Sequence, residues 1–279
     1  MTLSNMLRLG AGILLAVLAY SFQRPFRVLR SMEPYDNVEL PPDWQEKTEW
    51  VFARLMYPQH PNARFARFYR YGGMDWREGG TSWSQDYPRA DRHFALALRR
   101  LTRVDVRSVE QPVNLDDDDD VYNWPWLAAG EMGDWKLTEA QVKKLRDYLL
   151  RGGFLMLDDF WGTEEWDRFF ETMRLVFPDR AIVEVENADS IFHTVYDLDE
   201  RYQIMGEWAL RRGMTYRTEG TVAHWRGIYD DHGRVMVAMS FNSDIGDSWE
   251  WADDPDYPER YSALGIRLGV NYVVYSLTH

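Results

Sequence analysis

Two adjacent aspartates, Asp158 and Asp159, come directly after an apolar run at residues 154–157. The run has the length of a buried strand, and the carboxyl ends of strands in an open parallel sheet face the ligand crevice. Carboxylate pairs bind hard cations, or act as acid and base when their surroundings separate their pKa values. Asp158 and Asp159 are therefore candidate catalytic residues, and Asp159 is a candidate ligand for a divalent cation.

A structural role for this pair is the alternative. Successive residues of a strand face opposite sides of a sheet, so both carboxylates reach one pocket only if the strand has already curled into the loop. Otherwise they accept hydrogen bonds from loop and helix-terminal N–H groups.

A second polar segment, at residues 242–254, alternates carboxylates with indoles. Sugar-binding clefts use these side chains, because an indole covers C–H faces while carboxylates bind hydroxyl groups. An ordinary acidic loop anchored by two tryptophans has the same composition and is the alternative. The candidate ligand-binding residues here are Asn242, Asp244, Asp247, Trp249 and Trp251. Asp244 and Asp247 are also candidate metal ligands.

Further candidates lie elsewhere in the chain. Trp83 and Asp86 follow a glycine-rich loop at residues 72–80, and Trp161 follows the aspartate pair. If these segments meet residues 242–254 at the strand ends, together they form a ligand-binding crevice. His193, polar within an apolar run, is a candidate catalytic residue; a histidine that is hydrogen-bonded near the core is the alternative.

Several kinds of chemistry are excluded by the residues that the chain lacks. It has no cysteine, which removes thiolate nucleophiles, thiolate zinc sites and disulfides. It has no G-x-S-x-G, P-loop, G-x-G-x-x-G or H-E-x-x-H motif, and no histidine is followed two residues later by glutamate. Glutaminase and other cysteine-dependent activities are therefore not expected.

Composition indicates a globular, acidic protein. The 279 residues are 45% hydrophobic and carry a formal net charge of -13, with a sequence pI near 4.9. This charge disfavours nucleic acid as a partner. The run of five aspartates at residues 116–120 lacks the spaced ligands and turn glycine of a calcium loop, so we expect a solvated loop.

The N-terminal segment predicts export. An uncharged run at residues 9–22 lies between Arg8 and Arg24. It is shorter than the roughly 20 residues of a membrane-spanning helix but matches the apolar region of a signal peptide. Residues 1–30 are therefore a signal peptide or an uncleaved membrane anchor, with a buried helix as the alternative. The domain would be periplasmic or anchored to the cytoplasmic membrane facing outward, where an envelope complex could supply protein partners.

The remaining pattern predicts the architecture. Residues 31–62 read as a neck with an amphipathic helix at 44–56, and residues 63–279 as one domain. Strands expected at 64–69, 104–106, 122–129 and 154–159 alternate with helices at 88–101, 138–151 and 163–177, which predicts a doubly wound, mostly parallel α/β sheet with helices on both faces. A hairpin at 227–240 predicts antiparallel strands at one edge, before a last helix at 258–276.

Residues 83–91, 152–162, 176–178, 191–193 and 244–251 together resemble the bacterial family called domain of unknown function 4159. The resemblance covers roughly residues 60–279. It implies a class I glutamine-amidotransferase-like, flavodoxin-type fold, and it implies no reaction. Aspartate stands where the cysteine of the true amidotransferases would be.

Two hypotheses about function follow. The first is a non-catalytic ligand-binding or assembly module, exported or membrane-anchored, that holds a small polar ligand. The alternative is a carboxylate- or metal-dependent hydrolase acting on a small polar or carbohydrate-like substrate. It would use Asp158 or Asp159 together with Asp244, Asp247 or His193.

Overall fold

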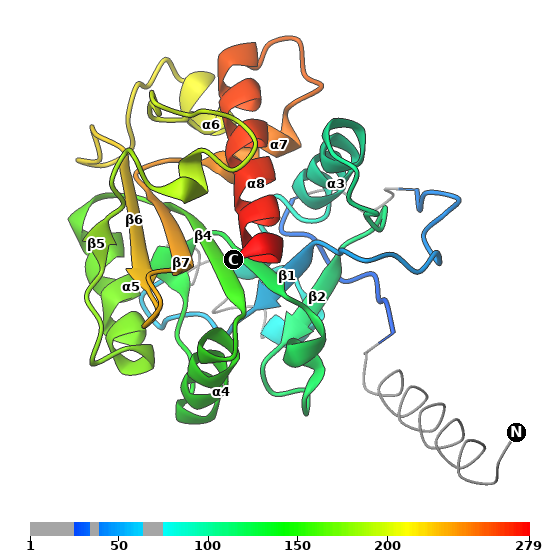
Figure 1. Cartoon of the computed structure of the whole chain (residues 1–279). Coiled ribbons are helices and arrows are strands. Elements are labelled where there is room, and N and C mark those ends of the chain that lie inside the picture. The colour runs from blue at the N-terminus through cyan, green and yellow to red at the C-terminus, as the bar shows by residue number, and fades with distance from the viewer. Residues whose placement is uncertain (1–24, 34–38, 64–74) are drawn as a thin grey trace, which may run out of the picture.

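The computed structural model describes residues 25–33, 39–63 and 75–279, which build a seven-stranded sheet (Figure 1). The sheet has the order β2-β1-β3-β4-β7-β6-β5. The strands are β1 (Ala53–Met56), β2 (Gln111–Asn114), β3 (Trp126–Ala129), β4 (Phe154–Phe160), β5 (Val183–Glu184), β6 (His224–Tyr229) and β7 (Val235–Phe241). Pairing is parallel from β2 to β7 and antiparallel from β7 to β5. This confirms the α/β prediction, and the architecture is compatible with a flavodoxin-like fold.

Helices cover both faces of the sheet (Figure 1). They are α3 (Arg89–Leu101), α4 (Glu139–Leu150), α5 (Gly162–Val176), α6 (Glu207–Leu210), α7 (Ile245–Glu250) and α8 (Glu259–Thr278). Side chains of β4 alternate between two cores: Phe154 and Met156 pack with α3, α7 and α8, whereas Leu155 and Leu157 pack with α4 and α5. This alternation follows from the two-residue period of a strand.

A local sequence signal explains where α4 begins, but not where α5 begins. Thr138 and Gln141 form the expected capping box at the start of α4. Helix α5 departs from the prediction, because Trp161 rather than Thr163 is its N-cap residue. The Glu165 carboxylate accepts a hydrogen bond from the Trp161 N–H at 2.7 Å and satisfies that backbone group from inside the helix.

The predicted neck is wrong in one respect that matters for the fold. Residues 44–56 form no helix; Ala53–Met56 is strand β1, which lies between β2 and β3 with every residue buried. The domain therefore begins before residue 63. The sequence does not reveal this buried strand, because a charged residue such as Arg54 is normally exposed. Its guanidinium is instead buried and paired with Asp91, with Nε 2.9 Å from Oδ2.

Two other predicted strands have different outcomes. The expected strand at 104–106 is reduced to a single bridge between Trp50 and Val106, and the strand beside β1 is Gln111–Asn114. Pro112 argues against a strand in the sequence, because proline lacks a backbone N–H to donate. It is tolerated in β2 because β2 is an edge strand. The strand expected at 64–69 lies outside the described residues, as does the apolar run at 9–22. Within the residues that the structure covers, no helix is both long and apolar enough to cross a bilayer.

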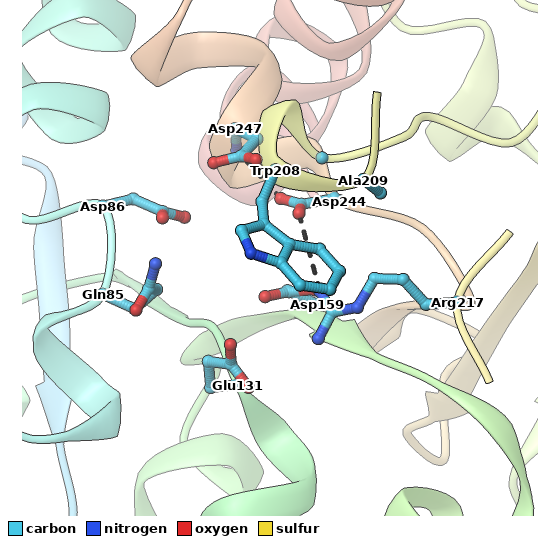
Figure 2. A pocket seen from close by; sticks show the side chains of 10 residues that line it. Gln85, Asp86, Glu131, Asp159, Trp208, Ala209, Arg217, Asp244 and Asp247 are labelled. Carbon is cyan, nitrogen blue, oxygen red and sulfur yellow. Dashed lines mark hydrogen bonds and ion pairs between the residues drawn. The ribbon is translucent and has the colours of Figure 1, made fainter. Parts of the chain in front are cut away.

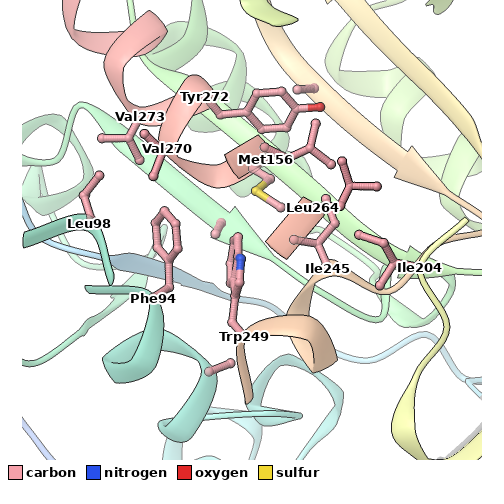
Figure 3. Packing of buried hydrophobic residues seen from close by; sticks show 14 of the residues in the cluster. Phe94, Leu98, Met156, Ile204, Ile245, Trp249, Leu264, Val270, Tyr272 and Val273 are labelled. Atoms are coloured by element: carbon pink, nitrogen blue, oxygen red, sulfur yellow. The ribbon is translucent and has the colours of Figure 1, made fainter. Parts of the chain in front are cut away.

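Helix α8 packs closely on α3 and α7 through its glycines (Figure 3). The rings of Phe94 and Trp249 stack with centroids 4.3 Å apart. A Cβ on Gly269 would lie 2.5 Å from Phe94 Cε2 and 2.8 Å from Trp249 Cζ2. Both rings are fixed in the core, so neither can move aside at low cost.

We expect Gly269→Val to destabilise the protein by about 1–3 kcal/mol through overpacking, although valine is the better helix former. Leu277→Ala, at an exposed position of the same helix, should change the free energy of unfolding by less than about 0.5 kcal/mol. Urea denaturation of both variants measures the two changes. Equal stability of Gly269→Val and wild type would contradict the close packing of α8.

Candidate functional site

A pocket of about 200 Å³ lies at the carboxyl ends of the parallel strands (Figure 2). Gln85 and Asp86 reach it from the connection between β1 and α3, Glu131 follows β3, and Asp159 belongs to β4. The segment between β7 and α7 and its first helical turn supply Asp244 and Asp247. Residues 206–217 contribute the remaining side of the pocket with Gly206, Trp208, Ala209 and Arg217. The predicted convergence at the strand ends is thus present, but residues 85–86 line the pocket and 75–80 do not.

A bulge in β4 brings both adjacent aspartates to this end of the sheet. From Leu157 to Phe160, β4 advances three residues while β7 advances two, from Met239 to Phe241. Phe160 therefore joins the core face that regular alternation would give to residue 159. Asp159 is the extra residue, with φ of 50°. The strand therefore curls at this point, and of the two aspartates only Asp159 lines the pocket.

Four non-glycine residues with left-handed backbone lie at or beside the pocket: Asp86, Glu131, Asp159 and Asn242, with φ between 50° and 59°. This conformation costs roughly 1–2 kcal/mol for an ordinary side chain and persists only where surrounding structure imposes it. Aspartate and asparagine tolerate it best, so Glu131 carries the largest cost. Such positions cluster at functional sites.

Arg217 is the cation of the pocket. Its Nη1 donates to Asp159 Oδ1 at 2.6 Å and lies 3.9 Å from Asp244 Oδ2, while its guanidinium lies 5.2 Å from the centre of the Trp161 ring. Burial alone would lower the pKa of Arg217, but the carboxylates of Asp159, Glu131 and Asp244 raise it above its usual range. Arg217 Nη2 is buried and has no hydrogen-bond partner.

Among the residues that the structure describes, the carboxyl groups of the pocket outnumber its cations. Five carboxyl groups line the pocket. Burial first, and then repulsion between neighbouring carboxylates, raises the pKa well above its usual value for Asp86, Glu131, Asp244 and Asp247. Without a compensating ligand, these groups hold protons at a pH where an exposed carboxyl would be ionised.

Asp158 does not line the pocket but contacts Gly246 at the start of α7. Its Oδ2 accepts a hydrogen bond from the Gly246 N–H at 2.7 Å, while Oδ1 is buried with no partner. Burial and the charges of Asp244 and Asp159 raise the pKa of Asp158. A Cβ on Gly246 would overlap Asp86 Oδ2, so only glycine allows this approach.

A different trio of aspartates from the predicted one could hold a metal ion. Carboxylate oxygens of Asp86, Asp244 and Asp247 all lie within 4.8 Å of one another. The sequence-based trio contained Asp159 in place of Asp86, but Asp159 Oδ1 already accepts hydrogen bonds from Arg217 and from Trp161 Nε1. No ordinary sequence spacing links Asp86 to the other two, which explains why the sequence did not reveal this group.

The predicted tryptophans do not line the pocket. Trp83 and Trp249 are core residues, and Trp161 is buried with its Nε1 donating to Asp159 Oδ1 at 2.6 Å. Trp251 lies next to Arg89, whose guanidinium is 4.7 Å from the ring centre. The indole that does line the pocket is Trp208, which is 46% exposed. Exposure of this kind has no signature in the sequence.

The other two candidates have structural roles. His193 accepts or donates through Nδ1 to Asp197 at 3.0 Å and through Nε2 to the Asn187 carbonyl at 2.8 Å, and it does not line the pocket. Asn242 Oδ1 accepts from the Gly162 N–H, and its Nδ2 donates to the Val222 carbonyl. Asn242 therefore fixes the start of α5 next to the pocket.

Comparison with known proteins identifies the family. The model of the domain of unknown function DUF4159 matches residues 67–277. The chain belongs to the DUF4159 family. No curated protein matches it. The pocket of this DUF4159 protein is built largely within the matched span.

Glu131→Gln tests the electrostatic account. Because the native pKa of Glu131 is raised above 4.5, the native state keeps this proton as the pH rises while the unfolded chain loses it. The free energy of unfolding therefore falls by up to about 1.4 kcal/mol per pH unit, from about pH 4.5 to the native pKa. The free energy of unfolding of the variant should fall less steeply with pH, so the variant should be more stable than wild type at pH 8.

Urea denaturation between pH 5 and 8, in buffer with a chelator, measures these slopes. Glu200→Gln, at an exposed glutamate, serves as the control and should follow wild type. If Glu131→Gln and wild type show the same pH dependence, the Glu131 carboxyl is not held protonated.

Proposed function

We propose that this DUF4159 protein is a non-catalytic module that binds a small polar molecule in the acidic pocket. The observation that carries the proposal is Arg217 Nη2, a buried donor without a partner on a residue that lines the pocket. Buried polar groups in native proteins are nearly always hydrogen-bonded, and each exception calls for an explanation. A ligand that accepts a hydrogen bond from the arginine accounts for this one.

The wall of the pocket defines the ligand chemistry. Five carboxyl groups face a molecule that offers hydrogen-bond donors, such as hydroxyl or amino groups. Arg217 Nη2 requires an acceptor oxygen on the same molecule. The indole of Trp208 offers an apolar face beside these polar groups (Figure 2). Monosaccharides, amino sugars and amino acids combine these features at a size that suits about 200 Å³.

We also infer that the fold is class I glutamine-amidotransferase-like with the nucleophile lost. Support comes from β4, which ends in a sharp turn before α5, as the strand before a nucleophile elbow does. Asp158 and Asp159 lie near the end of that strand, just before the turn, and the chain contains no cysteine. The inference means that the pocket descends from an amidotransferase active site but has no glutaminase activity.

We propose further that the domain works outside the cytoplasm, exported or anchored by residues 1–30. The apolar run at residues 9–22 with its flanking arginines supports this location. Such a module would serve an envelope complex, either as its ligand sensor or as an assembly part.

A metal-dependent hydrolase is the second candidate, favoured by the grouping of Asp86, Asp244 and Asp247. A hydrolase also needs an acid or base at the reacting bond. None of the histidines described in the structure lines the pocket, so buried carboxyls with raised pKa values would have to serve. Release of p-nitrophenol from glycosides, phosphates or esters, lost in Asp159→Asn, would favour the hydrolase over the module.

Ligand-detected saturation-transfer NMR tests the binding proposal with a panel of monosaccharides, amino sugars and amino acids, with and without Mg²⁺. At least one class should bind, and its affinity should fall about tenfold or more in Trp208→Ala and in Arg217→Lys. Lysine keeps a positive charge near Asp159 but lacks the second donor arm. No binding by any class, or binding unchanged in both variants, would overturn the proposal.

Tyr216→Ala is the matched control for Trp208→Ala. Tyr216 is 45% exposed, close to the 46% of Trp208, and does not line the pocket. Its loss should leave the binding unchanged. Thermal unfolding of each variant checks that the fold is intact.

A further inference from the structure

Three aspartates from two distant parts of the chain form the most acidic corner of the pocket. Asp86, Asp244 and Asp247 are 6%, 3% and 9% exposed, and their oxygens lie within 4.8 Å of one another. Asp244 is the N-cap residue of α7, where its Oδ1 accepts from the Asp247 N–H at 2.9 Å. Figure 2 shows the three side chains directed toward one space.

The protein offers little positive charge to this corner. Of the arginines and lysines that the structure describes, only Arg217 lines the pocket. Its nearest contact with the trio is the 3.9 Å separation from Asp244 Oδ2, and its closer partner is Asp159. Arg54, the next buried guanidinium, is held by Asp91. Three buried carboxylates so close together are stable only when protonated or bound to a cation.

A second observation points to a ligand at the same place. Arg217 is only 8% exposed, it lines the same pocket, and its Nη2 has no partner. This donor is not satisfied by the acidic trio, because the contact between Arg217 and Asp244 is made by Nη1, 3.9 Å from Oδ2. An oxygen atom that is not part of the described protein would satisfy it.

We propose that Asp86, Asp244 and Asp247 bind one hard divalent cation, of the Mg²⁺, Mn²⁺ and Ca²⁺ class, and that Arg217 Nη2 holds an oxygen of the small molecule bound beside this ion. The second clause rests on the proposed function; the first does not. An all-carboxylate set suits hard cations, which prefer oxygen ligands. The volume left in the pocket admits the water molecules or ligand oxygens that complete the coordination.

A neighbouring trio is less suitable. Glu33 and Glu250 also approach Asp86, but neither lines the pocket. Glu33 is already engaged, since it accepts hydrogen bonds from the Asp86 N–H at 2.9 Å and from Gln85 Nε2. The ion is therefore expected on the side of Asp244 and Asp247.

Gly206 shapes the site from the opposite segment. A Cβ at this position would overlap Asp244 Oδ2 and lie 2.7 Å from Asp247 Oδ2. The Asp247 Oδ2 atom also accepts from the Glu207 N–H at 2.6 Å. The start of α6 thus holds the carboxylate oxygens in place, so the site is assembled before an ion arrives.

Titration of chelator-treated protein with Mn²⁺, followed by electron paramagnetic resonance of the free ion, tests the first clause. We expect one bound Mn²⁺ per chain, displaced by excess Ca²⁺. Asp86→Asn and Asp247→Asn should each weaken Mn²⁺ binding by tenfold or more. Asparagine tolerates the positive φ of Asp86 and can still accept from Glu207 N–H at position 247, so both variants should fold.

Asp119→Asn is the matched control, because the run of five aspartates is the other place where cations could gather. Asp119 is exposed in that loop, and its loss should leave Mn²⁺ affinity unchanged. Three results would each overturn the proposal: no Mn²⁺ bound at millimolar concentration, equal affinity in wild type and Asp247→Asn, or loss of binding only in Asp119→Asn. In each case a ligand found by the NMR panel would still stand, so the two proposals fail separately.

The unfolding temperatures of the variants, measured with and without Mn²⁺, show both whether each variant folds and whether it binds the ion. In chelator the two asparagine variants should unfold at or above the wild-type temperature, since each removes a buried carboxyl group that burial and its neighbours keep from ionising. With Mn²⁺ added, only wild type and Asp119→Asn should shift upward. An upward shift of Asp86→Asn and Asp247→Asn equal to that of wild type would contradict a shared site.

Discussion

The repulsion between buried carboxyl groups at one end of the sheet is the interaction on which the site depends. Asp159 takes part in it because β4 carries one residue more than its neighbour β7 can match. The bulge directs Asp159 into the pocket while Asp158 contacts the start of α7. Connections after β1, β3 and β7 then bring further acids to the same edge. A ligand that relieves this repulsion binds with part of its free energy already stored in the protein.

The rest of the fold offsets the stability that is lost at the pocket. Left-handed backbone at Asp86, Glu131 and Asp159 and the raised pKa values of the carboxyls both work against stability. Two extensive cores, one on each face of the sheet, offset these terms. Most of the chain's tryptophans are residues of these two cores. Local strain and charge crowding within a well-packed frame are typical of sites kept for function rather than stability.

The sequence predicts the class of fold and the position of the pocket at the strand ends. It does not predict several of the residues that line the pocket. Periodicity and capping signals identified α3, α4, α8 and the β6–β7 hairpin, because those signals are local. Strand β1 was missed because the charge of Arg54 is compensated by Asp91, 37 residues away. Asp158, Asp159, Asp244 and Asp247 were found from their place after apolar strands. Glu131 and Arg217 lie outside the strands and α-helices and Trp208 lies in the short helix α6, and only tertiary structure brings them to the pocket.

The most direct measurement of the central claim is a ¹³C NMR titration of the side-chain carboxyl groups in metal-free protein. If buried carboxyls repel one another at the strand ends, several aspartate and glutamate resonances should titrate well above pH 5. Those resonances should move to lower pH when Asp86, Asp244 or Asp247 is replaced by asparagine. If every carboxyl titrates between about pH 3 and 5, as in exposed groups, the pocket holds no stored repulsion and the account is contradicted.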